Sequence, residues 1–446
     1  MDFLIIGGDA AGMSAASRAK RNRPDLNVTV LERTGDVSYS ACGMPYNIAD
    51  PQRPIDDLVV RRAEVFRDKQ GIDLLTGIEA TALEPSAQRV AARDGEGRER
   101  SFRYDKLLLA TGARPVRPAL PGMDLPGVMV LKSLAHGRAL KQFIDRRSVK
   151  KAVIIGMGYI ALEMCEALHE RGIAVDMIKH RKPFLPWMAE RLAQEVQSEV
   201  EAHGVGVYAG HPVERIEVDG AGLAVVAPEV TLRGDLVIVA VGVAPASELA
   251  VAAGLKTSVQ DAIAVDARQR TSDSAIFAAG DCADAFHVVT GRRTWIPLAL
   301  RANRAGWAVA DNVCGIDRRL DGVAGSAVFK VFDLQVARTG LNEAEARAAG
   351  LSPAAVVIQS RTRAHAHPGS SGFWVHMVGD RGSGRLLGVQ MVARDGAAHR
   401  LHAPAVALHA YMTVARFSQT DLGYAPPFGP TWDPMLTAAN QLLKKL

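Results

Sequence analysis

The chain has 446 residues, of which 48% are hydrophobic and 23% are charged. Such a composition suits a folded protein of two to four domains with an ample core. The formal net charge is only +5, and no run of five like charges occurs, so a nucleic-acid-binding tail is excluded. The longest apolar stretch, 236–246, is too short to cross a bilayer, and no signal-peptide pattern opens the chain. We therefore expect a cytoplasmic protein that binds neither nucleic acid nor membrane.

The four cysteines lie far apart, without a C-x-x-C pair or the spacing of a zinc site. This usage is typical of a reducing compartment and argues against a disulfide framework or a bound metal. We expect three of them to be small buried hydrophobic residues, namely Cys165, Cys282 and Cys314. Cys42 is different, because it lies among Ser, Gly and Pro in a loop-like stretch.

A βαβ unit opens the chain. The apolar run 3–6 predicts a buried parallel strand, residues 13–23 a helix, and residues 28–32 a second strand. A turn rich in glycine lets backbone N–H groups approach a pyrophosphate, and Glu32 at the end of the second strand can bind a ribose hydroxyl. Asp9 replaces the middle glycine of the usual pattern. The predicted contacts are Gly7, Gly8, Ala10, Ala11, Gly12 and Glu32.

A second dinucleotide unit begins about 150 residues later. The strand 106–110 ends in Thr111-Gly112, and the proline-rich connector 114–126 predicts a domain boundary. The strand 152–155 then leads into a second glycine-rich turn, a helix to Arg171 and the strand 173–178. Two such units imply two nucleotides, with electrons passing between them. The predicted contacts of the second unit are Gly156, Gly158, Tyr159 and Ile160.

The end of the second unit carries the basic run Lys179-His180-Arg181-Lys182, where an NAD site would usually have an acid. Cations attract a 2′-phosphate, which an acid would repel. We therefore predict NADPH as the reductant, with NADH possible, and contacts from Lys179, His180 and Arg181.

Three further segments follow in the chain. Residues 236–242 read as a buried strand, and residues 271–281 as a strand that ends in Gly280-Asp281, where a carboxylate can accept a hydrogen bond from a sugar or ribityl hydroxyl. Pro297 and Ala299 open a helix to residue 312, and its N-terminus suits the partial negative charge of a reduced flavin.

From about residue 323 the pattern changes to an α+β domain without a nucleotide motif. Strands are predicted at 329–332, 335–340, 356–358, 373–377 and 386–392. Asn342 is a candidate N-cap of a helix, and two more helices are predicted at 405–416 and 434–445. We expect this domain to form an interface.

The order of these motifs resembles the pyridine nucleotide-disulfide oxidoreductases over the whole chain. The stretch Ser40-Ala41-Cys42-Gly43-Met44-Pro45-Tyr46 resembles their single-cysteine branch, which holds coenzyme A-disulfide reductases, NAD(P)H persulfide reductases and NADH oxidases or peroxidases. The resemblance implies an α/β protein with two Rossmann-like domains and a C-terminal α+β dimerisation domain. FAD would occupy residues 1–112 and 244–322, NAD(P)H residues 113–243, and the dimerisation domain residues 323–446.

The resemblance also implies roles for single residues. Glu163 would lie close to nicotinamide and flavin, and Tyr424 would reach the cysteine of the second subunit in a homodimer. FAD contacts would come from Thr111, Gly112, Gly280, Asp281, Pro297 and Ala299, and coenzyme A contacts, less firmly, from Arg18, Arg21, Ser38 and Lys69. Ala10 stands where the oxidases and peroxidases carry a histidine, which favours the reductases.

A two-cysteine disulfide reductase would need a partner about five residues after Cys42, and Asn47 stands there. Cys42 can therefore form a mixed disulfide, a persulfide or a sulfenic acid. Our hypothesis is that NADPH reduces FAD, which reduces a Cys42–S–S–R bond, and that Tyr424 protonates or orients the leaving thiolate. We expect a helix N-terminus and the flavin to lower the pKa of Cys42.

Two other functions stay open. An NAD(P)H oxidase or peroxidase would reveal itself by oxygen uptake. An electron-transfer protein like the ferredoxin reductases would share both nucleotide domains but would need no cysteine at position 42.

Overall fold

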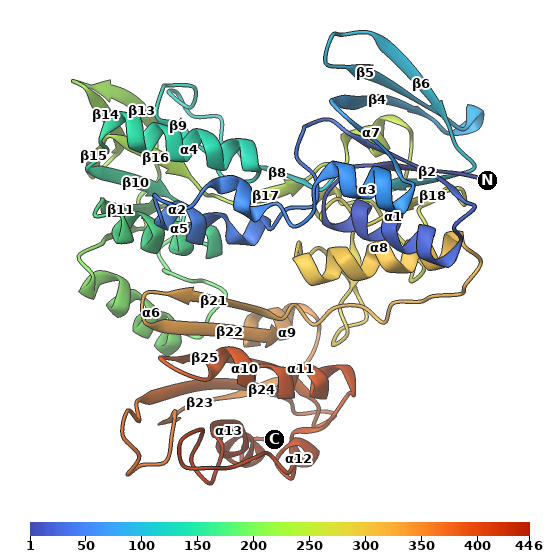
Figure 1. The fold of residues 1–446 in the computed structure, drawn as a ribbon. Coiled ribbons are helices and arrows are strands. Elements are labelled where there is room, and N and C mark those ends of the chain that lie inside the picture. The colour runs from blue at the N-terminus through green and yellow to red at the C-terminus, as the bar shows by residue number, and fades with distance from the viewer.

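The computed structural model describes residues 1–446 as two upper lobes above a third body (Figure 1). The first lobe is built on a five-stranded parallel sheet of order β18-β7-β1-β2-β3. Its strands are short and apolar, which suits a sheet buried on both faces. They are β1 (Asp2–Ile6), β2 (Asn27–Glu32), β3 (Asp73–Thr76), β7 (Lys106–Leu109) and β18 (Ile276–Ala278).

Two helices pack together beside this sheet, α1 (Ala10–Asn22) and α8 (Ala299–Val313). They can approach closely because Gly306 has no side chain: a Cβ atom there would lie 2.2 Å from the backbone oxygen of Ala11. The helix α1 begins three residues earlier than the sequence predicted, at Ala10, because Asp9 takes the extended N-cap conformation. The alanines of the glycine-rich turn thus belong to the first turn of the helix.

The second lobe repeats the arrangement with a parallel sheet of order β12-β11-β10-β16-β9. Its strands are β9 (Val128–Met129), β10 (Lys151–Ile155), β11 (Ala174–Lys179), β12 (Gly206–Ala209) and β16 (Leu236–Val239). Its helices are α4 (Leu134–Arg147), α5 (Tyr159–Glu170) and α6 (Glu190–Ala202). The short helix α2 (Met44–Ala49) follows β2 in the chain but packs against α5, so this segment crosses from one lobe to the other (Figure 1).

Several elements were not predicted from the sequence. Each lobe carries a three-stranded antiparallel sheet, and a short pair links the lobes at β8 (Ala113–Pro115) and β17 (Val243–Pro245). The two small sheets consist of β4 (Ile78–Glu84), β5 (Arg89–Asp94) and β6 (Glu99–Arg103), and of β13 (Arg215–Asp219), β14 (Gly222–Ala227) and β15 (Val230–Gly234). The remaining elements are α3 (Ala63–Gln70), α7 (Glu248–Ala252), β19 (Ala285–Phe286) and β20 (Arg293–Thr294).

The third body holds an antiparallel sheet of order β21-β22-β25-β24-β23. Asn342 caps α9 (Glu343–Ala348) in a reciprocal pair of hydrogen bonds with Glu345, which confirms the predicted N-cap. The strands are β21 (Ala327–Val331), β22 (Leu334–Gly340), β23 (Pro353–Arg361), β24 (Gly372–Asp380) and β25 (Leu386–Ala393).

The prediction of one helix over 405–416 is wrong. The structure has α10 (Ala397–Arg400), α11 (His402–His409) and α12 (Val414–Phe417), followed by α13 (Pro434–Leu443). The helix breaks at Tyr411, whose φ is +53°, because the oxygen of Met412 accepts a hydrogen bond of 2.9 Å from the backbone N–H of Leu386. No helix of the chain is both long and apolar enough to cross a membrane.

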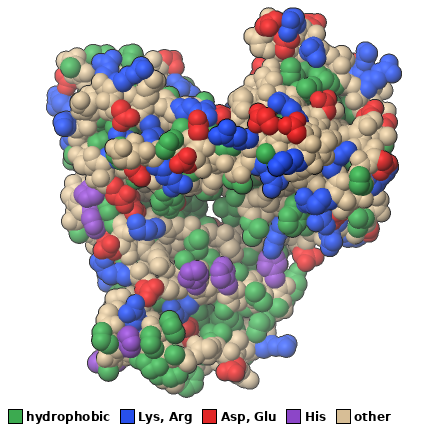
Figure 2. All heavy atoms as spheres, in the orientation of Figure 1, with side chains coloured by type: hydrophobic (Ala, Val, Ile, Leu, Met, Phe, Trp, Pro, Cys, Tyr) green, Lys and Arg blue, Asp and Glu red, His purple; other side chains and the backbone are tan.

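One apolar core joins the second lobe to the third body. It contains Met44 and Ile48 of α2, Leu162 of α5, and Phe329 and Val331 of β21. The segment that follows Cys42 is therefore anchored by packing, although it lies far along the chain from these partners. The surface is hollowed between the lobe of α5, the lobe of α8 and the third body (Figure 2).

Candidate active site

Cys42 lies in a tight turn, Ala41–Gly43, immediately before α2. The turn is fixed by hydrogen bonds from the backbone N–H of Ser40 to the oxygen of Leu58 (2.8 Å) and from that of Gly43 to the oxygen of Ser40 (3.0 Å). A Cβ atom on Gly43 would lie 2.7 Å from a methyl group of the buried Leu58, so a larger residue there would displace this leucine side chain. The turn leaves Cys42 exposed, with a free thiol.

Across the boundary between the lobes, Glu163 of α5 faces the segment that carries Cys42. The hydroxyl of Tyr46 donates a hydrogen bond of 3.0 Å to Oε1 of Glu163. Burial raises the pKa of Glu163, the hydrogen bond from Tyr46 lowers it, and the charge of Glu166 raises it. The sequence predicted Glu163 but missed Tyr46, whose only local signal is its place four residues after Cys42.

A cation was also missed. Nζ of Lys132, between β9 and α4, lies 3.1 Å from Oδ2 of Asp281, the predicted ribityl ligand. No local pattern marks Lys132, because its neighbours come from distant parts of the chain.

Although Cys42 is open to solvent, the groups around its sulfur raise the pKa of the thiol. Burial has the largest effect, followed by the charge of Glu163; Lys132 lowers the pKa, and Asp281 and Asp9 raise it. The expectation of a lowered pKa is therefore wrong for the groups that the protein supplies. Three nearby carboxylates and partial burial outweigh one lysine that is itself paired with Asp281.

The first glycine-rich turn has the shape of a phosphate cradle. Gly7 has a φ of +111°, and a Cβ atom on Gly12 would lie 1.9 Å from the oxygen of Gly7. The backbone N–H of Gly8 donates a hydrogen bond of 2.8 Å to Oε2 of Glu32. Oδ1 of Asp9 is buried without a hydrogen-bond partner, and burial raises its pKa to about 6. An unsatisfied polar atom beside a helix N-terminus fits a site built for a further polar group.

The second turn repeats the cradle. Gly156 has a φ of +119°, and its missing Cβ atom would lie 2.2 Å from the oxygen of Ala240. A Cβ atom built on Gly158 would meet no atom within 4 Å, so a ligand can approach the backbone of this residue. The ring of Tyr159 packs against Trp187 and Phe329, with centroids 5.4 and 5.0 Å away, whereas Ile160 is 37% exposed.

The basic run after β11 divides into two kinds of cation. Nζ of Lys179 donates hydrogen bonds to the backbone oxygens of Pro183 (2.8 Å) and Phe184 (3.2 Å), and burial lowers its pKa. His180 and Arg181 are exposed. Lys179 thus holds the loop, whereas His180 and Arg181 are accessible to a ligand.

The remaining predicted flavin contacts lie where strands end or helices begin. The hydroxyl of Thr111 donates a hydrogen bond of 2.5 Å to the oxygen of Ala246, and Gly112 next to it has a φ of +72°. The buried guanidinium of Arg301 donates a hydrogen bond of 3.1 Å to the oxygen of Gly280. The helix α8 begins at Ala299, just after Pro297, without a side-chain cap, so its first N–H groups are free for a ligand.

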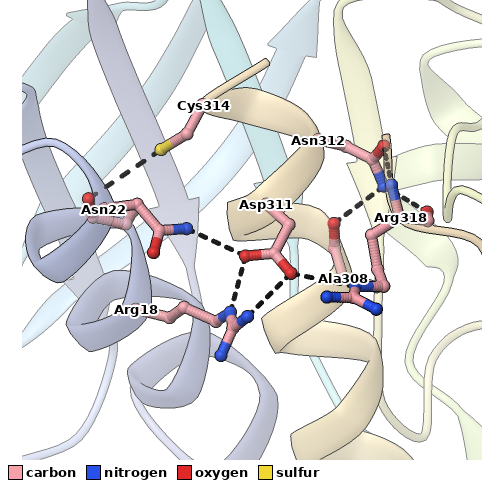
Figure 3. Close-up of polar contacts among 8 residues, drawn as sticks. Arg18, Asn22, Ala308, Asp311, Asn312, Cys314 and Arg318 are labelled. Carbon is pink, nitrogen blue, oxygen red and sulfur yellow. Dashed lines mark hydrogen bonds and ion pairs between the residues drawn. The ribbon is translucent and has the colours of Figure 1, made fainter. Parts of the chain in front are cut away.

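The predicted coenzyme A contacts differ in their surroundings. Arg18 is engaged in an ion pair with the buried Asp311 (Figure 3), whereas Arg21 and Lys69 are exposed. Ser38 is half-buried after β2, with a φ of +47°. Tyr424, 51% exposed, lies in the loop before α13.

The other three thiols lie away from this site. Cys165 and Cys282 are buried, as predicted, and burial raises the pKa of Cys165 to about 12. Cys314 is half-buried. Cys42 is therefore the exposed thiol of the chain.

Comparison with known proteins gives matches along the whole chain. The family model "Pyridine nucleotide-disulphide oxidoreductase" matches residues 1–306, and that of the dimerisation domain of the same family matches residues 326–435. A protein of Pyrococcus abyssi named "NAD(P)H sulfur oxidoreductase (CoA-dependent)" is 38% identical over 439 residues, which cover 98% of this chain and 97% of that protein.

Two further relatives are informative. A protein of Methanocaldococcus jannaschii named "NADH oxidase" is 32% identical over 450 residues, or 100% of this chain and 99% of that protein. Among solved structures, an NAD-dependent persulfide reductase from A. fulgidus superposes with a TM-score of 0.96 at 35% identity, covering 100% of this chain and 83% of that one.

Proposed function

Because this chain belongs to the pyridine nucleotide-disulphide oxidoreductases, we propose that it uses NADPH to reduce coenzyme A disulfide, or a related persulfide or polysulfide, through FAD and Cys42. The observation that carries the proposal is the exposed free thiol of Cys42 in the turn facing Glu163. The position five residues later is structural, because the amide of the buried Asn47 donates to the oxygen of Pro54 (2.9 Å) and accepts from Lys141 (3.1 Å). Cys42 must therefore exchange with an external sulfur.

The two cradles would hold the two nucleotides. FAD would be bound by the first turn with Glu32, by Thr111, Gly112 and Gly280, and by Asp281 and the N-terminus of α8. NADPH would be bound by Gly156, Gly158 and Ile160, with Tyr159 at the start of α5. When bound, FAD would supply the two-electron chemistry that connects the hydride of NADPH with cleavage of the disulfide. These assignments divide the chain into residues 1–112 and 244–322 for FAD, 113–243 for NADPH and 323–446 for dimerisation.

In this scheme the chain's own side chains bind the substrate and orient the reacting groups. Lys132 would hold the carboxylate of Asp281 in place and offset the negative charges near the Cys42 sulfur. Arg21, Lys69 and Ser38 would contact the nucleotide end of coenzyme A. In a homodimer, Tyr424 would orient or protonate the thiolate that leaves when Cys42 of the partner subunit attacks a disulfide.

The preference for NADPH rests on the exposed His180 and Arg181 at the end of β11, where no acid stands to repel a 2′-phosphate. The relative from Pyrococcus abyssi is named for both reductants. The solved persulfide reductase is named for NAD alone, so the two reductants must be compared directly.

A second candidate is an oxidase that passes electrons to oxygen, since the relative from Methanocaldococcus jannaschii bears that name. The methyl group of Ala10, in the first turn of α1, can neither donate nor accept a proton, which favours the sulfur substrate. Oxygen uptake measured with NADPH, in the presence and absence of coenzyme A disulfide, separates the two functions.

The proposal is tested with the FAD-loaded enzyme, NADPH, and either coenzyme A disulfide, coenzyme A persulfide or inorganic polysulfide. The variant Cys42→Ser should lose turnover of every sulfur substrate while its flavin absorbance stays that of the wild type. Cys314→Ser is the matched control, because it removes a half-buried thiol outside the site. Normal turnover by Cys42→Ser would overturn the proposal.

A further inference from the structure

The contact between Tyr46 and Glu163 joins two lobes at the reactive thiol. Tyr46 lies on α2, directly after the turn of Cys42, and Glu163 lies on α5. The tyrosine is 46% exposed, so its hydroxyl connects a half-buried carboxyl group with solvent. The hydrogen bond to Tyr46 holds Glu163 against the segment that carries Cys42, and the charge of Glu163 raises the pKa of both Cys42 and Tyr46.

Two carboxyl groups stand one turn apart on α5, and their partners differ. Glu166 forms an ion pair with Lys330 of β21, and its Oε2 accepts a hydrogen bond of 2.8 Å from the backbone N–H of Phe332. Glu163 has no cation and accepts only from the neutral hydroxyl of Tyr46. A carboxyl group without a cation, next to a second carboxylate, is the one that can hold a proton.

Reducing a disulfide with NADPH consumes one proton beyond the hydride. We propose that Tyr46 is a positioning residue, whose hydroxyl orients the carboxyl group of Glu163 so that Glu163 delivers this proton to the sulfur that leaves Cys42. The inference rests on the proposed function, which supplies the electron pair.

Two electrons break the bond between Sγ of Cys42 and the substrate sulfur, so that both sulfurs become thiolates. The substrate thiolate takes the proton of Glu163 and leaves as a thiol, while Cys42 stays a thiolate for the next disulfide. The Glu163 carboxylate then regains a proton from water beside the exposed tyrosine. A second substrate thiolate is released when Cys42 attacks the next disulfide, and it takes the proton that the hydride supplies.

The charged groups around the carboxyl of Glu163 are few. From the segment of α2 it faces Cys42 and Tyr46, and on α5 itself it lies one turn from Glu166, whose charge Lys330 of β21 offsets. Lys132 and Asp281 act on the pKa of Cys42 but are not among the groups that shift the pKa of Glu163. A change in the pH profile on substituting Tyr46 or Glu163 can therefore be separated from the effect of Lys132.

The test uses the FAD-loaded enzyme with coenzyme A attached to Cys42 as a mixed disulfide. After mixing with NADPH, flavin reduction and release of coenzyme A thiol are followed in a single turnover. Glu163→Gln should slow thiol release by about 100-fold, and Tyr46→Phe by about tenfold, with flavin reduction nearly unchanged. Release by the wild type should slow as pH rises, and this pH dependence should be lost in Glu163→Gln.

A second measurement does not depend on turnover. The rate at which iodoacetamide alkylates Cys42 is measured against pH in the FAD-loaded enzyme. Because Glu163 and Cys42 interact, the wild-type profile should contain, besides the inflection of the thiol itself, a second inflection from Glu163. Glu163→Gln should remove this second inflection, and Tyr46→Phe should shift it to higher pH. Tyr104→Phe is the matched control, because its buried hydroxyl has no partner, and its profile should match the wild type.

Tyr46→Phe profiles that superpose on the wild type in both measurements would overturn the inference and leave the proposed function intact. A wild-type enzyme that releases no thiol from the mixed disulfide would instead overturn the proposed function, and this inference with it.

Discussion

Arg18 of α1 holds Asp311 of α8 in a two-point ion pair, with Nε 2.6 Å from Oδ1 and Nη2 2.9 Å from Oδ2 (Figure 3). The side chain of Asp311 is 1% exposed, and it also accepts hydrogen bonds from Asn22 (2.8 Å) and Arg318 (3.2 Å). The guanidinium of Arg18 is thus used to join the two helices of the first lobe.

We predict that Arg18→Met destabilises the protein, because it leaves a buried carboxylate with fewer partners. Since Asn22 and Arg318 remain, the free energy of unfolding should fall by about 2–3 kcal/mol. The control is Arg21→Met on the same helix, whose exposed side chain should matter by less than about 0.5 kcal/mol. Urea unfolding measures both, and equal stability of the two variants would contradict the role given to Asp311.

The cation beside Cys42 gives a second prediction. Lys132→Met removes the one charge that lowers the pKa of this thiol, so the inflection of the alkylation profile of Cys42 should move to higher pH. Lys106→Met, at the first residue of β7, should leave the profile unchanged. An inflection that stays in place, or moves to lower pH, would show that Lys132 does not act on the thiol.

The choice of reductant should depend on Arg181 more than on Lys179. Losing a charge-assisted hydrogen bond to a 2′-phosphate should lower kcat/KM for NADPH by about 10- to 100-fold in Arg181→Ala, with little change for NADH. Lys179→Met should change the ratio between the two reductants much less, because its ammonium group is bound to two backbone oxygens. A wild-type kcat/KM clearly higher for NADH would refute the preference for NADPH.

Asp9 should make the stability of the FAD-free protein depend on pH. Its pKa in the fold is about 6 instead of 3.8. Between these two pH values the folded state holds a proton that the unfolded chain has released. This stabilisation is complete at low pH and is lost as pH rises to about 6. Asp9→Asn should therefore raise the melting temperature above that pH, with a gain that shrinks toward pH 4. A gain independent of pH would contradict this account.

Local sequence patterns predicted most of the elements that hold the nucleotides. The apolar runs around the turns of Gly7 and Gly156 became parallel strands, and Asn342 became a helix cap. A continuous apolar pattern did not show the break at Tyr411, because a backbone hydrogen bond to a distant strand causes it. The small antiparallel sheets lack strong alternation and were missed.

The site itself could be predicted only in part. A motif marks Cys42, and a family resemblance marks Glu163. Tyr46 contacts Glu163 because α2 crosses to the second lobe. Lys132 contacts Asp281 because the segment between β9 and α4 lies beside the residue that follows Gly280. Such contacts depend on tertiary packing, as does the pKa of Cys42, which the protein's own groups raise instead of lowering.

The most direct test of the central claim is a mass spectrum of the intact protein after one equivalent of coenzyme A disulfide per subunit is added. The spectrum should show one coenzyme A per chain, mapped to the peptide of Cys42, released by reductant and absent from Cys42→Ser. An enzyme that turns over coenzyme A disulfide while Cys42 never carries the adduct would contradict it.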